Sequence, residues 1–388
     1  MSAPAPRRVI VGLSGGVDSA VAALLLLEAG YDVQGLFMQN WDDADSHCTA
    51  AQDYQDARAV ARELGIVLHR VNFEAEYRRE VFAQFLEEYR AGRTPNPDVL
   101  CNRQIKFGVC LDYARRLGGE CFATGHYART TLDAQGAQLL KGCDPDKDQS
   151  YFLHQVPREI FAQVLFPIGH LSKPEVRERA RAAGLAVADK PDSTGICFIG
   201  ERPFADFLAQ YLPETPGIIE SLQGVALGRH RGLPFYTLGQ RSGIGVGGAR
   251  GAAAEPWYVA RKDARRNVLI LAQRHELEAL ACPVVRTGPM NWLTAAPDSE
   301  FAATAKIRYR QPDQDCRAVV RADGSVELHF AQPQRAVTPG QYAVLYRAEQ
   351  CLGGGVITET LYLRQCTRTR SPPVPRRARG VFAIGGLS

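Results

Sequence analysis

The chain has 388 residues, of which 45% are hydrophobic and 23% are charged, a composition typical of a soluble globular protein with two or three domains. Its longest apolar stretch, residues 20–27, is far shorter than the roughly 20 residues of a membrane helix, and the N-terminus lacks the apolar core of a secretory signal. We therefore expect a cytoplasmic protein with no membrane segment, and the net charge of +4 is too small to indicate a nucleic-acid partner by itself.

The N-terminal part alternates strand and helix patterns. Residues 8–13 form a β-rich run, a glycine- and serine-rich turn follows, and residues 20–29 favour a helix that ends at Gly30. Residues 33–38 and 66–71 are predicted strands, with a predicted helix at 49–64 between them. Strands that alternate with helices indicate an α/β domain with a parallel sheet.

The pattern continues to about residue 204. Apolar residues at helical spacing predict a helix over 74–89. Residues 94–102 are predicted to be an irregular loop, because Pro95 and Pro97 disfavour helix at the residues before them. A helix at 105–117, a strand at 121–124 and a helix at 173–183 complete a catalytic domain over 1–204.

After residue 204 the chain changes to short β-prone runs separated by glycine and proline, at 233–238, 256–261 and 268–272. We expect a central β-rich domain over 205–285 and a C-terminal β domain over 286–366, with the change of pattern near 287–296. Residues 367–388 contain five arginines, several prolines and no acidic residue. This composition predicts a basic, disordered tail.

The turn after the first strand has the sequence Ser-Gly-Gly-Val-Asp-Ser at residues 14–19. Glycines let the backbone approach a ligand, and the start of a helix favours anions, so we expect this turn to bind phosphate. It contains no lysine and is therefore not the G-x-x-x-x-G-K-[ST] loop; it matches the SGGxDS pyrophosphate loop, which suits attack at the α-phosphate and transfer of AMP. The pattern leaves the second substrate open, since amidoligases, argininosuccinate synthases and tRNA-modifying enzymes share it.

Ten cysteines are scattered along the chain without a C-x-x-C pair, which argues against a structural zinc site. We expect no fixed metal site in the protein. In a reducing cytosol the default for each cysteine is a small buried apolar side chain.

A series of longer motifs resembles the bacterial tRNA-specific 2-thiouridylase family from residue 11 to about residue 363. The motifs are, in order, GLSGGVDSAV, LFMQNW, GRTPNPDVLCN, KFG, ATGHYAR, KDQSYFL, DSTGICFIGER, TLGQR, EPWYV, KIRYRQP, TPGQYAV and CLGGG. The resemblance implies an α/β pyrophosphate-loop domain of the adenine nucleotide alpha hydrolase type, a small central β-rich domain, a C-terminal β-barrel and a monomer.

The resemblance also implies a reaction, the ATP-dependent 2-thiolation of the wobble uridine of tRNA, with release of AMP and pyrophosphate. Cys197 would carry a persulfide, and Cys101 would be the nucleophile that forms the Cys101–Cys197 disulfide; an alternative order frees hydrosulfide first. Either order needs a thiolate at Cys101. Asp98 would be the general acid or base. Mg²⁺ would accompany ATP, and an upstream sulfur-relay protein or cysteine desulfurase would supply the persulfide sulfur.

Two groups of contact residues follow from the same motifs. ATP would meet Gly12, Leu13, Ser14, Gly15, Gly16, Val17, Asp18, Ser19, Met38 and Gly125. The target base and the tRNA, expected to be those for Lys, Glu and Gln, would meet Asn96, Pro97, Asp98, His126, Lys147, Asp148, Gln149, Arg308, Tyr309 and Gln341.

Structural alternatives to these roles come from the residues themselves. Asp98 could cap a turn and Met38 could belong to the core. His126 could be a loop histidine with satisfied hydrogen bonds, and Arg308-Tyr309 could be an ordinary pair on a strand. For the whole chain, a small-molecule amidoligase and a noncatalytic tRNA-binding protein are the two competing functions. The two motif cysteines speak against both.

Overall fold

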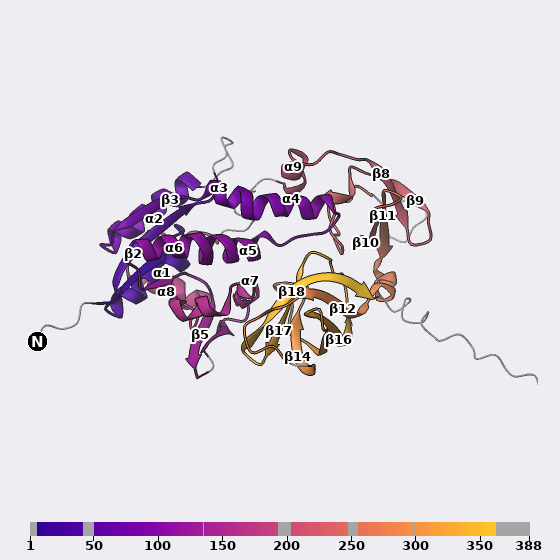
Figure 1. Ribbon diagram of the computed structural model, residues 1–388. Helices are drawn as coiled ribbons and strands as arrows, with labels where there is room; N and C mark the ends of the chain where they lie inside the picture. Colours follow the sequence, from indigo (N-terminus) through magenta and orange to yellow (C-terminus); the bar gives the residue numbers. More distant parts are fainter. Residues whose placement is uncertain are drawn as a thin grey trace, which may run out of the picture.

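The structure is a computed structural model that describes residues 6–41, 50–134, 136–192, 203–246, 255–297 and 299–361. Three parts are visible in Figure 1: an α/β domain, a small β-rich domain, and a β-barrel formed by the last strands. This confirms the predicted fold class. Within the described residues, no helix has the length and apolar character needed to cross a membrane.

The α/β domain is built on a five-stranded parallel sheet. The strand order is β3 (Leu68–Asn72), β2 (Asp32–Gln39), β1 (Arg8–Gly12), β4 (Cys121–Ala123) and β7 (Val164–Leu165). Side chains alternate between the two faces of a strand, so Val9 and Val11 enter one core and Ile10 the other. The first face packs on α1 (Val17–Glu28), α2 (Ala50–Glu63) and α8 (Lys173–Ala182).

The opposite face packs on two long helical segments. One runs without a break through α3 (Glu74–Tyr77), the π-helix η1 (Arg78–Phe82) and α4 (Ala83–Arg90). The other comprises α5 (Pro97–Leu100), the π-helix η2 (Cys101–Val109) and α6 (Cys110–Arg116). Apolar residues of both segments share one core with Ile10, Leu36 and Phe122 of the sheet.

The predicted loop at 94–102 is wrong for its second half, which is helical from Pro97 onward. Asn96 is extended, as expected before a proline, and forms the N-cap. Pro97 then occupies the first helical turn, where a missing N–H costs nothing because it has no partner there. The consequence is that Cys101 lies in a helical segment rather than in a loop.

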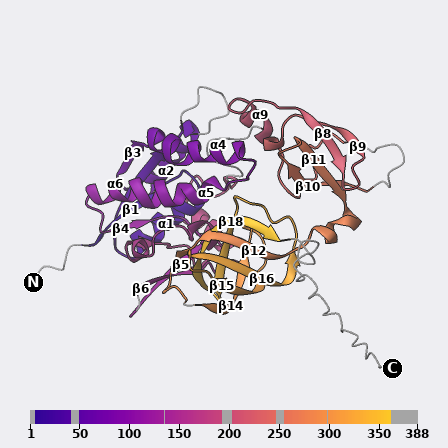
Figure 2. The same ribbon diagram turned by 45° about the vertical axis from the view of Figure 1, so that its right-hand side comes forward.

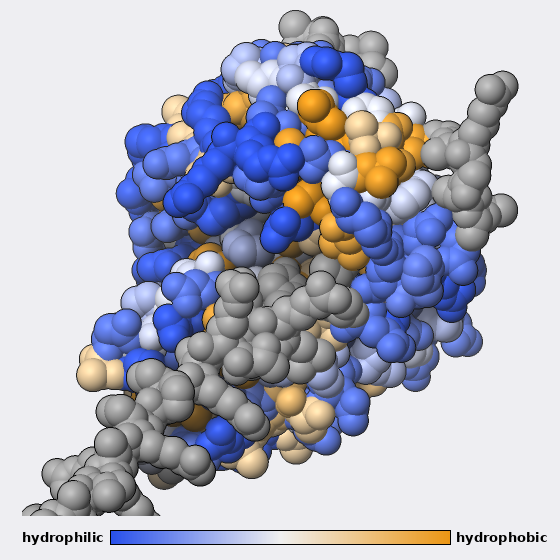
Figure 3. Space-filling view, turned by 90° about the vertical axis from the view of Figure 1, so that its right-hand side faces the viewer, coloured by the Kyte–Doolittle hydropathy of each residue, from blue (hydrophilic) through white to orange (hydrophobic). Residues whose placement is uncertain are grey.

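The central domain contains a four-stranded sheet in the order β10 (Trp257–Asp263), β11 (Val268–Gln273), β8 (Gly217–Ser221) and β9 (Ala226–His230), preceded by α9 (Phe204–Ala209). The predicted strand at 233–238 is wrong, because the chain there makes a 3₁₀ turn over Leu233–Phe235, and Pro234 cannot donate to a sheet. Figure 3 shows a mostly hydrophilic face with one gathering of apolar side chains. In the central domain Ile218 and Val225 are 44% and 60% exposed.

The C-terminal part is a closed barrel of six antiparallel strands, visible in Figure 2. The strands are β12 (Cys282–Pro289), β16 (Ser325–Gln334), β15 (Gln314–Val320), β14 (Glu300–Lys306), β17 (Tyr342–Arg347) and β18 (Gln350–Leu361), and β18 pairs again with β12. The short β13 (Asn291–Trp292) also pairs with β18. A hairpin of the first domain, β5 (Ala128–Asp133) and β6 (Gly136–Lys141), extends this sheet through Leu140 opposite Gln350.

A buried ion pair joins the barrel to the α/β domain. Lys306 Nζ donates to Asp148 Oδ2 at 3.2 Å, with the two side chains 10% and 2% exposed. The other oxygen of Asp148 accepts hydrogen bonds from the backbone N–H groups of Gly142 and Ser150, each at 3.1 Å. Nearby, the Gln155 amide donates to the carbonyl of Gly354 at 2.7 Å. The barrel is therefore fixed against the segment just after Lys147 and helps to position it.

We expect Lys306→Met to destabilise the protein by about 3–5 kcal/mol, because it leaves the Asp148 carboxylate buried without its cation. Urea unfolding would measure the change. Arg317→Met is the matched control, since its bridge to Glu300 is about half exposed and should contribute less than about 1 kcal/mol. Equal effects of the two substitutions would contradict a specific role for the buried pair.

Candidate active site

The turn at residues 14–19, which the sequence predicts to bind phosphate and which is called the phosphate loop below, leads directly into helix α1 and is held by internal hydrogen bonds. The Ser19 hydroxyl donates to the carbonyl of Gly16 at 3.0 Å and accepts from the N–H of Ser14 at 3.2 Å. Helix α1 begins at Val17, three residues earlier than the sequence indicates, with Gly16 as its N-cap. Leu13 is buried and its N–H donates to Leu36, so β1 continues directly into the loop. The loop therefore presents the first N–H groups of α1, a suitable site for phosphate.

Two glycines let other backbone segments come close to this loop. Gly15 has φ of +79°, and a Cβ there would lie 2.2 Å from the carbonyl oxygen of Asp53. A Cβ on Gly125 would lie 2.6 Å from the N of Ser19. Gly12, at the end of β1, lies against Phe122. The strand end of β4 is thus held against the start of α1, which explains glycine at position 125.

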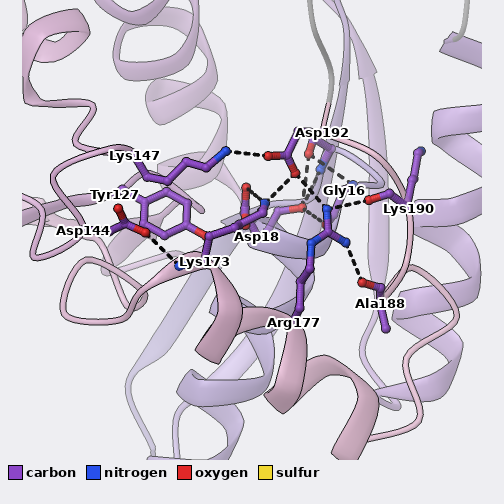
Figure 4. A network of polar contacts seen from close by, with 12 residues as sticks. Gly16, Asp18, Tyr127, Asp144, Lys147, Lys173, Arg177, Ala188, Lys190 and Asp192 are labelled. Atoms are coloured by element: carbon purple, nitrogen blue, oxygen red, sulfur yellow. Dashed lines mark hydrogen bonds and ion pairs between the residues drawn. The ribbon is translucent and has the colours of Figure 1, made fainter. Parts of the chain in front are cut away.

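A cluster of charged side chains surrounds Asp18 (Figure 4). Lys173 Nζ lies 2.7 and 2.9 Å from the two oxygens of Asp18 and 2.7 Å from Asp192, and its side chain is only 10% exposed. The Tyr127 hydroxyl also donates to Asp18, at 2.8 Å. Lys173 begins α8, where a capping box formed by Ser172 and Glu175 fixes the start of the helix. Helix α8, distant in the sequence, thus places an ammonium group beside a loop whose own motif contains no lysine.

Asp192 forms ion pairs with several cations of this cluster. Its carboxylate pairs with Lys147 at 2.7 Å and with Arg177 at 3.1 Å, in addition to Lys173. Burial would raise the pKa of Asp192, but the hydrogen bonds from Lys147 and Lys173 outweigh burial and lower it to about 2. Asp192 is thus negatively charged at neutral pH and holds the cations beside the loop.

Lys190 links the phosphate loop to helix α2. Its Nζ donates to the carbonyl of Gly15 at 3.0 Å and to Asp53 and Asp56 of α2 at 2.7 and 2.5 Å. Burial would lower the pKa of Lys190, but the hydrogen bonds to the two carboxylates raise it. Sequence reasoning missed Lys173 and Lys190, which belong to no recognisable local pattern. It also assigned no role to Asp192, although Asp192 is the first residue of the DSTGICFIGER motif.

The segment with Asp98 and Cys101 forms the second part of the site. Cys101 is 3% exposed and begins the π-helix η2. Asp98 is partly exposed, on α5; burial raises the pKa of its carboxyl, although the charge of Lys106 opposes the shift. The preceding residues are held by the barrel, since the Gln341 amide donates to the carbonyls of Thr94 and Pro95 at 2.8 and 3.0 Å.

His126 connects the two parts of the site. It follows Gly125, and its ring lies 5.8 Å from that of Phe107 on η2. His126 is buried and forms a 2.7 Å hydrogen bond with Thr124. Burial, assisted by the charge of Lys106, lowers its pKa well below the usual value, so the imidazole is neutral at neutral pH.

The residues expected to touch tRNA fall into an exposed and a buried group. Arg308 is exposed and Tyr309 partly exposed, in a turn after β14 rather than on a strand. The Tyr309 ring lies 4.4 Å from that of Phe152, and its hydroxyl donates to the carbonyl of Lys147 at 3.4 Å. Lys147 and Tyr309 are therefore brought together from two domains.

The remaining predicted residues have internal partners. Asp148 is buried in the ion pair described above, and the Gln149 side-chain oxygen accepts from the N–H of Tyr127 at 2.9 Å. Asn96 is partly exposed and Pro97 is buried. Met38, near the end of β2, is partly buried against the core.

Cys197 lies outside the described residues, as do residues 193–202 around it. The last described residue before them is Asp192, which is bound to Lys147 and Lys173. Asp192, the last described residue before this segment, therefore lies beside the phosphate loop.

Comparisons with known proteins cover most of the chain. Residues 7–201 match the family described as tRNA methyl transferase HUP domain, residues 205–273 the tRNA methyl transferase PRC-barrel domain, and residues 284–357 the aminomethyltransferase beta-barrel domain. A solved structure, a 4-thiouridine synthetase–RNA complex with bound ATP, aligns with 53% of this chain and 49% of that chain at 19% identity and a TM-score of 0.35, a likeness too weak for a functional argument.

Curated relatives are much more similar. The tRNA-specific 2-thiouridylase MnmA of Methylococcus capsulatus is 57% identical over 357 residues, which are 91% of this chain and 96% of the relative. The protein of the same name from Marinobacter nauticus is 56% identical over 363 residues, 92% of each chain. The chain therefore belongs to the family of tRNA-specific 2-thiouridylases, the MnmA sulfurtransferases.

Proposed function

We propose that this protein is an ATP-dependent enzyme that replaces the 2-oxygen of the wobble uridine of tRNA by sulfur. The observation that supports this most strongly is the connection between the phosphate loop and the Asp98–Cys101 segment. Gly125 touches the loop and the next residue, His126, lies against Phe107 of the same helical segment as Cys101. These contacts support a proposed nucleotide site and a proposed nucleophilic thiol on adjoining elements of one domain, an arrangement that suits activation followed by sulfur transfer.

In the proposed first step, the uracil O2 attacks the α-phosphate of ATP and pyrophosphate leaves. The N–H groups at the start of α1 and the ammonium of Lys173 would hold the leaving pyrophosphate. Mg²⁺ bound with the nucleotide would neutralise part of the phosphate charge. Asp98 would accept the proton from N3 of the base, and its raised pKa makes it a stronger base than an exposed aspartate. The product is a base whose O2 carries AMP, a far better leaving group than oxide.

In the second step, the terminal sulfur of a Cys197 persulfide attacks C2 and AMP departs. The Cys101 thiolate then attacks the Cys197 sulfur; the bond from Cys197 to the transferred sulfur breaks, its electron pair stays with the sulfur on C2, and a Cys101–Cys197 disulfide forms. A thiol reductant must reopen that disulfide before the next turnover. If Cys101 attacks first instead, hydrosulfide is released and becomes the nucleophile toward C2.

The exposed Arg308 and the partly exposed Lys147 and Tyr309 would contact the tRNA, since a cation beside an aromatic ring can bind phosphate and stack on a base. His126 and Gln341 would act indirectly. His126 would support the segment around Cys101 and Asp98 on which the target base would lie, and Gln341 would hold the backbone before Asp98. We further propose a cytoplasmic monomer, with domains over 1–204, 205–285 and 286–366. Its substrates would be the tRNAs for Lys, Glu and Gln, and a sulfur-relay protein or cysteine desulfurase would load Cys197.

Pyrophosphate release should depend on tRNA, and Cys197→Ser should abolish thiolation while sparing adenylation, because activation precedes attack by sulfur. ATP labelled at the α-phosphate would label the tRNA in this variant, and pyrophosphate release would be followed in parallel. Release that depends on a small-molecule acceptor instead of tRNA would favour an amidoligase. Loss of adenylation in Cys197→Ser would contradict the order of steps.

Asp98→Asn should lower the adenylation rate by at least about 100-fold, since the amide cannot accept a proton. In the unmodified enzyme the rate should fall as the pH drops through the raised pKa of Asp98, at a midpoint above the ordinary value of about 3.9, because the protonated carboxyl is not a base. The pH profile of pyrophosphate release measures both effects. Asp112→Asn, at a solvent-exposed bridge on α6, is the control and should keep the normal profile.

Lys173→Met should lower kcat/KM for ATP by about 100-fold, because it removes a preorganised cation from the leaving pyrophosphate. Steady-state kinetics with varied ATP would measure the loss. Arg181→Met, near the other end of α8, removes an exposed bridge to Asp189 and should change the constant by less than about twofold. A wild-type constant for Lys173→Met would rule out this role.

A further inference from the structure

Cys101 lies in surroundings that disfavour the thiolate it needs. Its side chain is 3% exposed and belongs to an apolar core with Val99, Leu100 and Ile105. A buried thiol resists ionisation unless a positive charge or hydrogen-bond donors stabilise the anion. A cation near Cys101 would therefore favour the proposed reaction, on which this inference rests.

Lys106 is suitably placed in the chain to be that cation. Cys101 and Lys106 belong to the same π-helix, Cys101–Val109, in which hydrogen bonds join residues i and i+5. Lys106 thus follows Cys101 by one turn of this helix. The next residue, Phe107, packs against His126, so the turn faces the end of β4 beside the phosphate loop.

Lys106 is also uncommitted. It is partly exposed, and it forms neither a salt bridge nor a hydrogen bond with any other described residue. By contrast, the lysines near the phosphate loop, Lys147, Lys173 and Lys190, are each paired with carboxylates. An unpaired ammonium in this position retains its charge for the groups around it.

The titratable groups around Lys106 are consistent with that role. Its charge lowers the pKa of Asp98 on α5, of His126 after β4 and of Cys110 at the start of α6. Burial raises the pKa of Cys110 most, and negative charge at Cys101 raises it further, so Cys101 and Lys106 act on one common neighbour. Asp98 is the carboxylate in this set, and burial raises its pKa more than the charge of Lys106 lowers it.

The other elements packed on this helix carry charges that are largely paired with one another. Glu74 of α3 pairs with Arg78 of η1, and Asp112 of α6 pairs with Arg115, while Glu76 of α3 is partly exposed. On α7 (Ser150–Leu153), burial raises the pKa of Tyr151, and just after it burial lowers the pKa of His154 to about 4, so both are neutral near pH 7. On η1, Arg79 is paired with Glu80 in an exposed bridge. Arg103, on the same helix as Cys101, is exposed.

We propose that Lys106 is a positioning residue for the sulfur step: its ammonium holds Cys101 as a thiolate, ready to attack the sulfur of Cys197. Lys106 acts through Cys101 and takes no part in bond making.

The test measures the ionisation of Cys101 in the full-length protein. Ultraviolet absorbance of the thiolate is recorded against pH, and the curve of the Cys101→Ser variant is subtracted to isolate the signal of Cys101. Lys106→Met, with the Cys101→Ser/Lys106→Met double variant as its reference, should raise the midpoint of the Cys101 titration by about 1–3 pH units. Lys106→Arg keeps a positive charge and should return this midpoint most of the way to that of the unmodified protein. Arg103→Met removes an exposed charge from the same helix and should leave the midpoint nearly unchanged.

Thiolation of tRNA supplies the second readout. Lys106→Met should thiolate at least about tenfold more slowly near pH 7 and recover at higher pH, while adenylation in the same samples stays within about twofold. An unchanged Cys101 midpoint in a folded Lys106→Met protein would overturn the proposal, even if thiolation is slow. Failure of the proposed function would look different, because no thiolated base would form with any variant or with the unmodified enzyme.

Discussion

The close approach of the end of β4 to the start of α1 is the constraint on which the rest of the site depends. It exists because Gly125 has no side chain, so the backbone of Asp18 and Ser19 can lie against it. One side of this contact holds the phosphate loop; on the other side the next residue, His126, packs against Phe107 of the helical segment that contains Cys101. A substitution here would separate the nucleotide from the sulfur chemistry even if both halves kept their own structures.

The site has two regions that differ in charge: a cluster of ion pairs around Asp18 and a mostly apolar region around Cys101. Around Asp18 the cations are already paired, and Asp192 holds Lys147 and Lys173 in fixed positions, so little reorganisation is needed when a phosphate arrives. Cys101 packs among apolar side chains, and Asp98 and Lys106 are charged residues of the same helical segment. The first region suits binding of a polyanion, and the second shields a thiol from water but disfavours its ionised form unless a cation is near.

The sequence predicted the elements that depend on local pattern. The SGGVDS turn and the strand–helix alternation are local features, and the structure confirms the α/β domain, the central β-rich domain and the barrel. Lys173 could not be found in this way, because 155 residues separate it from its partner Asp18. The helix at Pro97 was missed because proline was weighed as a breaker and not as a first-turn residue. The assigned roles of Cys197 and of the disulfide stay predictions, since that segment lies outside the described residues.

Nucleoside analysis of tRNA incubated with the protein, ATP, Mg²⁺ and a sulfide source tests the central claim most directly. The account predicts 2-thiouridine at the wobble position with the unmodified protein and its loss with Cys101→Ser when the sulfur comes from a persulfide-loaded enzyme. If AMP and pyrophosphate form while no thiolated base appears under any sulfur supply, ATP-dependent activation would stand, but the proposed sulfur transfer would be contradicted.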